Sequence, residues 1–323
     1  MIKAKIAGFL AGLIVLAWPG RGSAPEVIRS VALEEVLSVG TLDDGALVQW
    51  TGIAADPSGR IYVLDMLDYA LKKFDSRGRL LLKTGRQGQG PGEFSAPRAL
   101  ALNGDRIYAL DQSRPGLLVF DTELRYQGTI AAARPLSMIA SVSPGRLAVA
   151  GITLVGQPAR IFFIDREGRV LSEFNYLDKV EFYLADSINT AADADGNLYL
   201  AYGYQDRIEK RDGRGRILWT WSLSGSAAVE TDTYRAGGRE FLIPKKLFYK
   251  DAALDRQGHL LVLCGGQTRH PSRDVYVFGL SGTRLAMFTL PEPSHCLFVD
   301  DNGFLYARAN EGLTVKKYRI VYR

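Results

Sequence analysis

The chain has few of the residues that build metal centres and covalent cross-links. Its 323 residues include three histidines and two cysteines. Two cysteines are too few for the dense disulfide framework that holds small secreted domains together. Long apolar segments are also scarce, since the run Ile6–Trp18 has thirteen residues and a membrane-spanning helix needs about 20. The composition therefore excludes a disulfide scaffold and indicates that the apolar run does not span a membrane.

The first residues instead have the pattern of an export signal. Lys3 and Lys5 precede the apolar run, and Pro19-Gly20 and a stretch of small residues follow it. We predict a cleaved signal peptide at residues 1–24, a periplasmic or secreted protein, and no membrane span after cleavage. No cysteine lies near the junction, which excludes the usual lipoprotein anchor.

The apparent basic charge is partly a property of this segment. The whole chain has a formal net charge of +5. Removing residues 1–24 removes three basic residues and no acidic one, which leaves 37 basic against 35 acidic residues and a charge of +2. A charge so close to neutral does not indicate nucleic-acid binding.

What the chain does have is a repeat of about forty-five residues. It is clearest at 52–78, GIAADPSGRIYVLDMLDYALKKFDSRG, where strand, tight turn, strand, loop, strand and tight turn follow one another. The middle of each second strand marks six copies: Ile61, Ile107, Leu147, Leu198, Leu260 and Leu305. A repeat of this period is typical of propellers and solenoids.

Most copies carry Asp-x-x-Gly between the first two strands, as at Asp56–Gly59 and Asp193–Gly196. Aspartate at the first turn position accepts backbone hydrogen bonds, and glycine at the fourth tolerates the exit conformation. These aspartates could also be metal ligands, but turn formation explains them without a metal.

The two ends of the chain indicate a closed ring. The last copy lacks a fourth strand, and the strand-like segment Val31–Gly40 belongs to no copy. We predict that Val31–Gly40 completes the blade formed by Asp300–Tyr322, because closure protects strand edges. The predicted fold is all-β: one domain, residues 25–323, that forms a six-bladed β-propeller of four-stranded antiparallel blades.

The repeat resembles the NHL-type propellers. The resemblance depends on the phrase GIAADPSGRIYVLD at 52–65 and on the linker GRQGQGPGEF at 85–94, followed by Pro97. That family includes protein-binding, RNA-binding and enzymatic members, so the resemblance implies the fold strongly and the function weakly.

Long insertions fall on one face of the predicted propeller. The turns of the opposite face are uniformly short, whereas Ser224–Phe248, Asn175–Ser187, Gly151–Ala159 and Cys264–Asp274 all join strands at the first face. Loops on rigid scaffolds carry function, so this loop-rich face is the predicted working face. Neutral drift of insertions is the alternative. The predicted contacts on these loops are Tyr183, Tyr234, Arg235, Arg239 and Phe241.

The start of each first strand borders the central channel on the same face. Counting back from the second strands places Gly52, Arg98, Met138, Asn189, Asp251 and Cys296 in a ring, with Lys250 and His295 one residue earlier. Polar groups that converge at a concave mouth indicate a ligand site, and polar lining of a water-filled channel is the structural alternative. The predicted ligand site is Arg98, Asn189, Lys250, Asp251, His295 and Cys296, with Ser224–Phe248 as a rim or lid.

Catalytic chemistry has weaker support. Three histidines cannot form a zinc site, because His259 belongs to the opposite face. A calcium site would have only Asn189 and Asp251 at the ring positions. His295 and Cys296 are adjacent in a strand and project to opposite sides, so they do not form a nucleophilic pair. We also expect Cys264 and Cys296 to be too far apart for a disulfide.

The sequence thus predicts an exported, monomeric, non-catalytic propeller, without a cofactor, that binds a protein, a peptide or a small ligand. The alternative is a divalent-metal-assisted hydrolase or lyase, similar to a lactonase, with calcium at the channel mouth. Arg98→Ala and Asp251→Ala are both expected to change the free energy of unfolding by less than about 1 kcal/mol.

Overall fold

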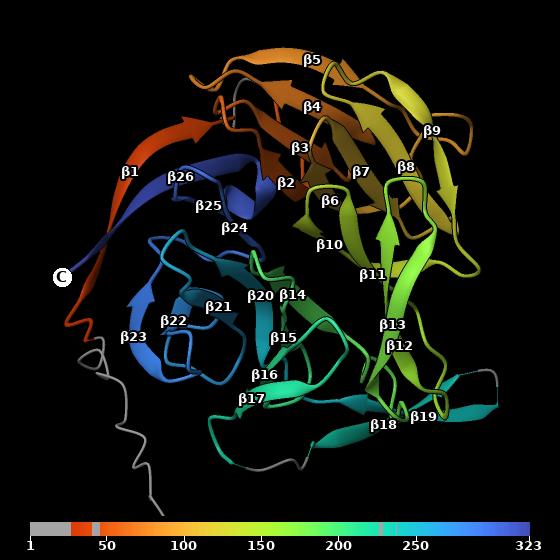
Figure 1. Ribbon diagram of the computed structural model, residues 1–323, viewed down its shortest axis with the longest axis vertical. Coiled ribbons are helices and arrows are strands. Elements are labelled where there is room, and N and C mark those ends of the chain that lie inside the picture. The colour runs from red at the N-terminus through yellow and green to blue at the C-terminus, as the bar shows by residue number, and fades with distance from the viewer. Residues whose placement is uncertain (1–26, 41–45, 226–228, 237) are drawn as a thin grey trace, which may run out of the picture.

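The computed structural model describes residues 27–40, 46–225, 229–236 and 238–323, and the predicted signal peptide lies outside them. Within these residues, six antiparallel sheets of four strands surround a central channel (Figure 1). The all-β six-bladed propeller predicted from the repeat is therefore confirmed. The described residues include one short helical element, the 3-10 helix η1 (Asn310–Gly312), and no helix long enough to cross a membrane.

The blades follow the chain in order. Blade one is β2 (Trp50–Ala55), β3 (Ile61–Asp65), β4 (Ala70–Phe74) and β5 (Leu80–Thr84). Blade two is β6 (Pro97–Asn103), β7 (Arg106–Asp111), β8 (Gly116–Asp121) and β9 (Tyr126–Ala131). Blade three is β10 (Leu136–Ser143), β11 (Arg146–Gly151), β12 (Ala159–Asp165) and β13 (Val170–Leu177).

Blade four is β14 (Ile188–Ala192), β15 (Leu198–Tyr202), β16 (Ile208–Arg211) and β17 (Ile217–Trp221). Blade five is β20 (Tyr249–Leu254), β21 (Leu260–Cys264), β22 (Asp274–Phe278) and β23 (Arg284–Thr289). Blade six is β24 (Leu297–Val299), β25 (Phe304–Ala309), β26 (Thr314–Tyr322) and, from the other end of the chain, β1 (Val31–Val39).

The N-terminal strand closes the ring as predicted. β1 pairs antiparallel with β26 from Val31 opposite Tyr322 to Val39 opposite Val315. In Figure 1 the red β1 lies along the blue β26. Lys316 and Arg319 add ion pairs to Glu35 and Glu34, both at 2.9 Å. The two ends of the chain therefore form one sheet, so blade six has four strands like the other blades.

The short turns opposite the loop-rich face form as the Asp-x-x-Gly motif predicts. Asp56 Oδ1 accepts hydrogen bonds from the backbone N–H groups of Ser58 and Arg60, both at 3.0 Å, while Arg60 Nε donates to Asp56 Oδ2 at 2.6 Å. The same Asp–Arg pairing occurs at Asp75, Asp121, Asp165 and Asp212. These carboxylates accept the hydrogen bonds that hold the turns, which supports their structural role.

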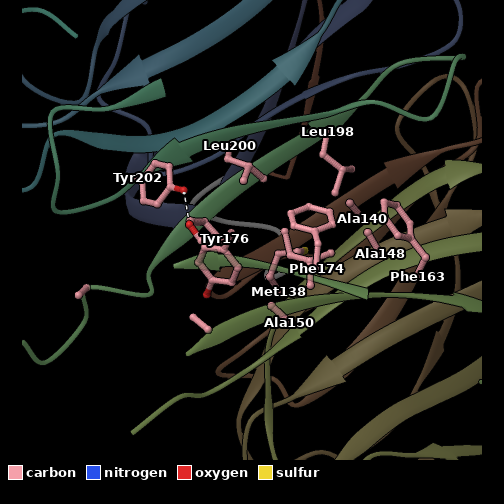
Figure 2. Packing of buried hydrophobic residues seen from close by; sticks show 14 of the residues in the cluster. Met138, Ala140, Ala148, Ala150, Phe163, Phe174, Tyr176, Leu198, Leu200 and Tyr202 are labelled. Carbon is pink, nitrogen blue, oxygen red and sulfur yellow. Dashed lines mark hydrogen bonds between the residues drawn. The ribbon is translucent and has the colours of Figure 1, made fainter. Parts of the chain in front are cut away.

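Each pair of neighbouring blades encloses apolar side chains. Between blades three and four, Met138, Phe163 and Phe174 pack against Leu198 and Leu200 (Figure 2). The hydroxyl of Tyr202 donates to the carbonyl oxygen of Tyr176 at the edge of this cluster. Met138, which the repeat alignment placed at the channel mouth, is 5% exposed and belongs to this core.

Bulges at the start of the first strands were not predicted. The pairing register shifts at Thr51, Arg98, Ser137 and Lys250, so each of these four residues is the extra residue of its strand. A bulge bends the strand and redirects the side chain of the extra residue. Four blades therefore present a redirected side chain at the loop-rich end of the channel.

The longest insertion contains a hairpin of its own. β18 (Thr231–Ala236) pairs with β19 (Arg239–Pro244) outside the six blades. Its attachments include Tyr183 N, which donates to Leu242 O at 3.1 Å. Figure 1 shows the hairpin at the outer rim near β12 and β13, away from the channel axis. The hairpin therefore forms part of the rim, and its described residues do not cover the channel.

Candidate channel-mouth site

A cavity of about 1100 Å³ follows the central channel. It is lined by first strands from all six blades, from Gly52, Asp251 and Cys296 near the loop-rich face to Pro57, Asn103 and Asp301 at the opposite turns. Of the six predicted site residues, only Asp251 and Cys296 line this cavity. The cavity also extends to the face with short turns, to which the sequence analysis assigned no role.

Asp251 is the acidic residue at the loop-side end of the cavity. Its Oδ1 accepts a hydrogen bond from Ala252 N at 2.8 Å, and its Oδ2 accepts one from Leu297 N in blade six at 2.7 Å. Desolvation of the carboxyl group raises the pKa of Asp251 to about 7, against the lowering effects of these two bonds and of Arg98. Near neutral pH the residue is therefore about half protonated.

Lys250 and His295 lie together beside Asp251. Lys250 Nζ is 3.1 Å from His295 Nδ1. Partial desolvation lowers the pKa of both groups, and Arg308 lowers both further. Lys250 and Arg98 also lower the pKa of His295. The imidazole is therefore neutral at neutral pH and can accept the hydrogen bond from the lysine.

Arg98 joins this group from blade two, at a position that the repeat alignment misassigned. Ala55 pairs with Ile61 in blade one and Leu102 pairs with Ile107 in blade two, so the first turn of blade two is one residue shorter. Counting nine residues back from Ile107 therefore gives Arg98, whereas the residue equivalent to Gly52 of blade one is Ala99. Arg98 is the bulged residue, which makes it the counterpart of Lys250 and not of Asp251.

Arg308 completes the cluster and was missed by the sequence analysis. It lies in β25 and favours the neutral form of Lys250 and of His295 through its charge. Its Nη2 donates to Glu311 O, while its buried Nε has no hydrogen-bond partner among the described residues. A sequence signal was available, because the corresponding positions three residues after the second-strand markers are Leu64, Leu110, Ala150, Ala201 and Leu263.

The other acidic groups near the loop-rich face are engaged in backbone contacts. Asp65 accepts hydrogen bonds from Val48 N and Gln49 N, Asp111 from Ser95 N and Ala96 N, and Asp206 from Leu223 N and Ser224 N. These bonds hold the linkers that enter and leave the blades. Of the carboxyl groups that act on the cationic cluster of Arg98, Lys250 and Arg308, Asp251 lies near Arg98 and has a partly suppressed charge, while Asp65 and Glu311 act on Arg308.

Asn189 and the two cysteines have structural environments. Asn189 Nδ2 donates to Tyr249 O at 3.1 Å and so connects blades four and five. Cys264 and Cys296 are both free, as expected. Desolvation, with the charge of Asp251, raises the pKa of the Cys296 thiol well above its ordinary value. Cys296 is therefore a protonated lining residue and a poor nucleophile.

The predicted loop contacts are separate from the cationic cluster. Tyr183 and Tyr234 are each 56% exposed, and Phe241 is 37% exposed. Arg235 Nε donates to Glu240 Oε1 at 2.6 Å within the hairpin. Arg239 begins β19, but its side chain lies outside the described residues. These side chains form an exposed surface near the rim, at some distance from the channel.

Metal-ligating residues do not converge in the part of the chain that the structure describes. No three side chains of His, Cys, Asp or Glu form a group that could hold a metal ion there. Asn189 and Asp251, the expected calcium ligands, direct polar atoms to the backbone groups of Tyr249, Ala252 and Leu297. The residues of the mouth therefore fit an anion better than a cation.

Comparison with known proteins agrees with this architecture. The family model DUF5128, described as 6-bladed beta-propeller, matches residues 29–235. The chain belongs to this family of six-bladed propellers. A search of curated proteins found no match.

Solved propellers share the fold at low sequence identity. A streptogramin B lyase is 10% identical with a TM-score of 0.58, and the match covers 92% of this chain and all of that one. A regucalcin from Agrobacterium tumefaciens, named as a calcium-binding protein, is 15% identical with a TM-score of 0.54, over 88% of this chain and 95% of that one. A virginiamycin B lyase from Staphylococcus aureus is 10% identical with a TM-score of 0.55, over 90% of this chain and all of that one. Such distant similarity shows the fold alone.

Proposed function

We propose that this protein is an exported binding propeller that captures an anionic group of a protein, peptide or small ligand at the loop-side mouth of its channel. The observation that carries the proposal is the convergence of Arg98, Lys250 and Arg308 from blades two, five and six. Guanidinium and ammonium groups bind carboxylates and phosphates through short, charge-assisted hydrogen bonds.

The environment of these groups favours an incoming anion. Arg98 has no hydrogen bond or ion pair among the described residues and is exposed. The buried Nε of Arg308 lacks a partner, and a buried donor without a partner costs about 1–3 kcal/mol. An anion that accepts from Arg98 would give this exposed guanidinium a partner, and it would also be attracted by the charge of Arg308. By taking up a proton near neutral pH, Asp251 loses the negative charge that attracts Arg98.

Calorimetry with citrate, a probe with three carboxylates, tests the proposal. At pH 6 we expect measurable binding, and Arg98→Ala should weaken it about tenfold or more, because a hydrogen bond to a charged group contributes about 1.5–3 kcal/mol. Arg77→Ala is the matched control, since Arg77 is an exposed arginine on the face with short turns. Absence of citrate binding, or equal weakening by both variants, contradicts the proposal.

The natural ligand can be sought with the same variants. Mature protein immobilised on a support would be exposed to periplasmic extract, and the bound molecules identified by mass spectrometry. A ligand that is retained by the unmodified protein and lost with Arg98→Ala belongs to the cationic mouth. A ligand that is lost with Tyr234→Ala instead belongs to the exposed hairpin surface.

A metal-assisted hydrolase or lyase remains the second candidate, because solved propellers of this fold include lyases. The donor groups of the mouth support it less well, as no suitable group of three ligands is present in the described residues. Metal analysis of the purified protein and thermal melts with and without a chelator test it. A bound divalent ion whose removal strongly lowers the melting temperature would favour the enzyme.

A further inference from the structure

The middle of the central channel is mostly apolar, although Ser141 and Thr190 also line it. Side chains that line it between its two ends include Leu100, Leu102, Ile139, Leu254 and Phe298, all of them partly exposed. The charged lining residues are Asp251 at the loop side and, at the end with the opposite turns, Asp193, Asp195, Lys210, Asp255, Arg256, Asp300 and Asp301. The same five side chains also pack against the apolar clusters between neighbouring blades, and their exposed parts give the channel an apolar inner surface.

The apolar segment continues directly from the cationic mouth. Asp251 and Cys296 line the cavity, and both are within the electrostatic influence of Arg98. The lining stretch of β6 runs from Ala99 to Asn103, which corresponds to roughly 16 Å at about 3.3 Å per residue. The channel thus has a mostly aliphatic bore that begins at Asp251 and Cys296, and Lys250 and His295 of the cationic mouth are the residues that precede these two in the sequence.

We infer that the ligand of this propeller is an anionic amphiphile, with its head at Arg98, Lys250 and Arg308 and its aliphatic chain in the bore. This inference rests on the proposed function, to which it adds the class of ligand. The cavity of about 1100 Å³ has room for such a chain. A carboxylate and a phosphate head would be recognised by the same three cations.

A series of fatty acids of increasing length tests the apolar bore, and an uncharged alcohol of the same length tests the cationic head site. Calorimetry at pH 6 would compare hexanoate, octanoate and decanoate below their micelle concentrations. We expect the affinity to rise about two- to fourfold for each added methylene, since burying one contributes about 0.8 kcal/mol. Decanol should bind at least about tenfold more weakly than decanoate, because it lacks the charged head. Decyl phosphate identifies which anionic head binds more tightly.

Variants of the bore and of the mouth should have different effects. Thr190 lines the cavity and is partly exposed, so Thr190→Phe should block the bore and abolish the gain with chain length. Thr190→Val is the matched control of nearly equal volume. Ser141→Trp, at an exposed position of the same cavity, is the second blocking variant, and thermal melts establish which variants fold. Arg98→Ala should weaken all three fatty acids by a similar factor.

The outcomes distinguish this inference from the proposed function. Equal affinities for hexanoate and decanoate, with both still sensitive to Arg98→Ala, would overturn the aliphatic bore and leave anion binding intact. Decanol that binds as tightly as decanoate, with neither affected by Arg98→Ala, would overturn the cationic head site. A chain-length gain that survives Thr190→Phe and Ser141→Trp would place the chain outside the channel and also overturn the inference.

Discussion

At the scale of single residues, Asp251 connects stability with binding. Its carboxyl group accepts backbone hydrogen bonds from Ala252 and from Leu297 of the next blade, while desolvation raises its pKa to about 7. The group therefore fastens blades five and six and also titrates beside the cationic cluster. Ionised Asp251 offsets the charge of Arg98, whereas protonated Asp251 leaves that charge available to a ligand.

The raised pKa predicts how stability depends on pH. Between pH 4 and pH 7 folded Asp251 keeps a proton that the unfolded chain, with a pKa near 3.9, has already lost. The contribution of Asp251 to the free energy of unfolding is therefore largest near pH 4 and is lost as the pH rises through 7. Urea unfolding of the unmodified protein and of Asp251→Asn at pH 4, 5.5, 7 and 8 measures it.

The comparison with Asp251→Asn removes the contributions of other groups. We expect the free energy of unfolding of the unmodified protein to fall relative to that of Asp251→Asn as the pH rises to 7. Above pH 7 the difference between the two free energies should stay constant. A difference that shifts the other way would mean that the pKa of Asp251 is lowered in the folded protein.

Removing Arg98 and removing Asp251 should have unequal costs. Arg98 is exposed and makes no hydrogen bond among the described residues, so Arg98→Ala should change the free energy of unfolding by less than about 0.5 kcal/mol. Asp251→Ala leaves the N–H groups of Ala252 and Leu297 without their partner and should cost about 1–3 kcal/mol. Urea denaturation at pH 5 measures both.

The sequence pattern assigns neither residue to a strand core and so predicts a small cost for both substitutions. The inter-blade hydrogen bond to Leu297 changes that expectation for Asp251. Equal costs for the two variants would show that this bond contributes no stability.

At the scale of elements, the bulges of the first strands decide which side chains reach the channel mouth. Arg98 and Lys250 are each the extra residue of a bulge, whereas β14 pairs without a bulge and has no equivalent residue. Because a bulge changes the direction of one side chain, blades two and five place a cation at the mouth and blade four does not.

The hairpin β18–β19 should be dispensable for folding. It pairs with itself outside the six blades and lies at the rim. Replacing residues 231–244 by a short Gly-Ser linker should therefore lower the melting temperature by no more than about 3 °C. Citrate affinity should be unchanged, because the cationic cluster belongs to blades two, five and six. Differential scanning calorimetry and titration calorimetry measure the two effects.

Tyr183→Ala is the control for the rim surface without loss of the hairpin. If the deletion abolishes citrate binding while the point variant does not, the hairpin contributes directly to the mouth, contrary to its position at the rim.

At the scale of the whole molecule, stability depends on ring closure. β1 pairs with β26 along nearly its whole length, and Val31 and Leu33 pack against the core between blades five and six. Deleting residues 25–40 from a chain that lacks residues 1–24 should expose the edge of β26 and open this core. We expect the melting temperature to fall by more than about 10 °C, well beyond the effect of trimming an ordinary terminus.

The double variant Glu34→Ala, Glu35→Ala is the matched control, since it removes the ion pairs to Arg319 and Lys316 and leaves the strand in place. Exposed ion pairs contribute about 0–1 kcal/mol each, so this variant should melt within a few degrees of the unmodified protein. A deletion that melts at the unchanged temperature contradicts closure by β1.

The sequence by itself determined the architecture, because local chemistry repeats with the fold. The Asp-x-x-Gly turns, as at Asp56–Gly59, hold the first two strands of four blades through contacts within five residues. The unclaimed strand at Val31 and the vacancy after Tyr322 predicted closure from counting alone. Four site residues, Arg98, Lys250, Asp251 and His295, could be assigned to one mouth for the same reason.

Only the tertiary structure decided how these residues face one another. A bulge and a shorter turn move Arg98 by one register position, and neither is apparent from residue types. Arg308 comes from a second strand, and Asn189 is held by a backbone carbonyl sixty residues away. The apolar bore exists only when six first strands surround one axis. Such features depend on contacts between distant segments, which a local repeat does not encode.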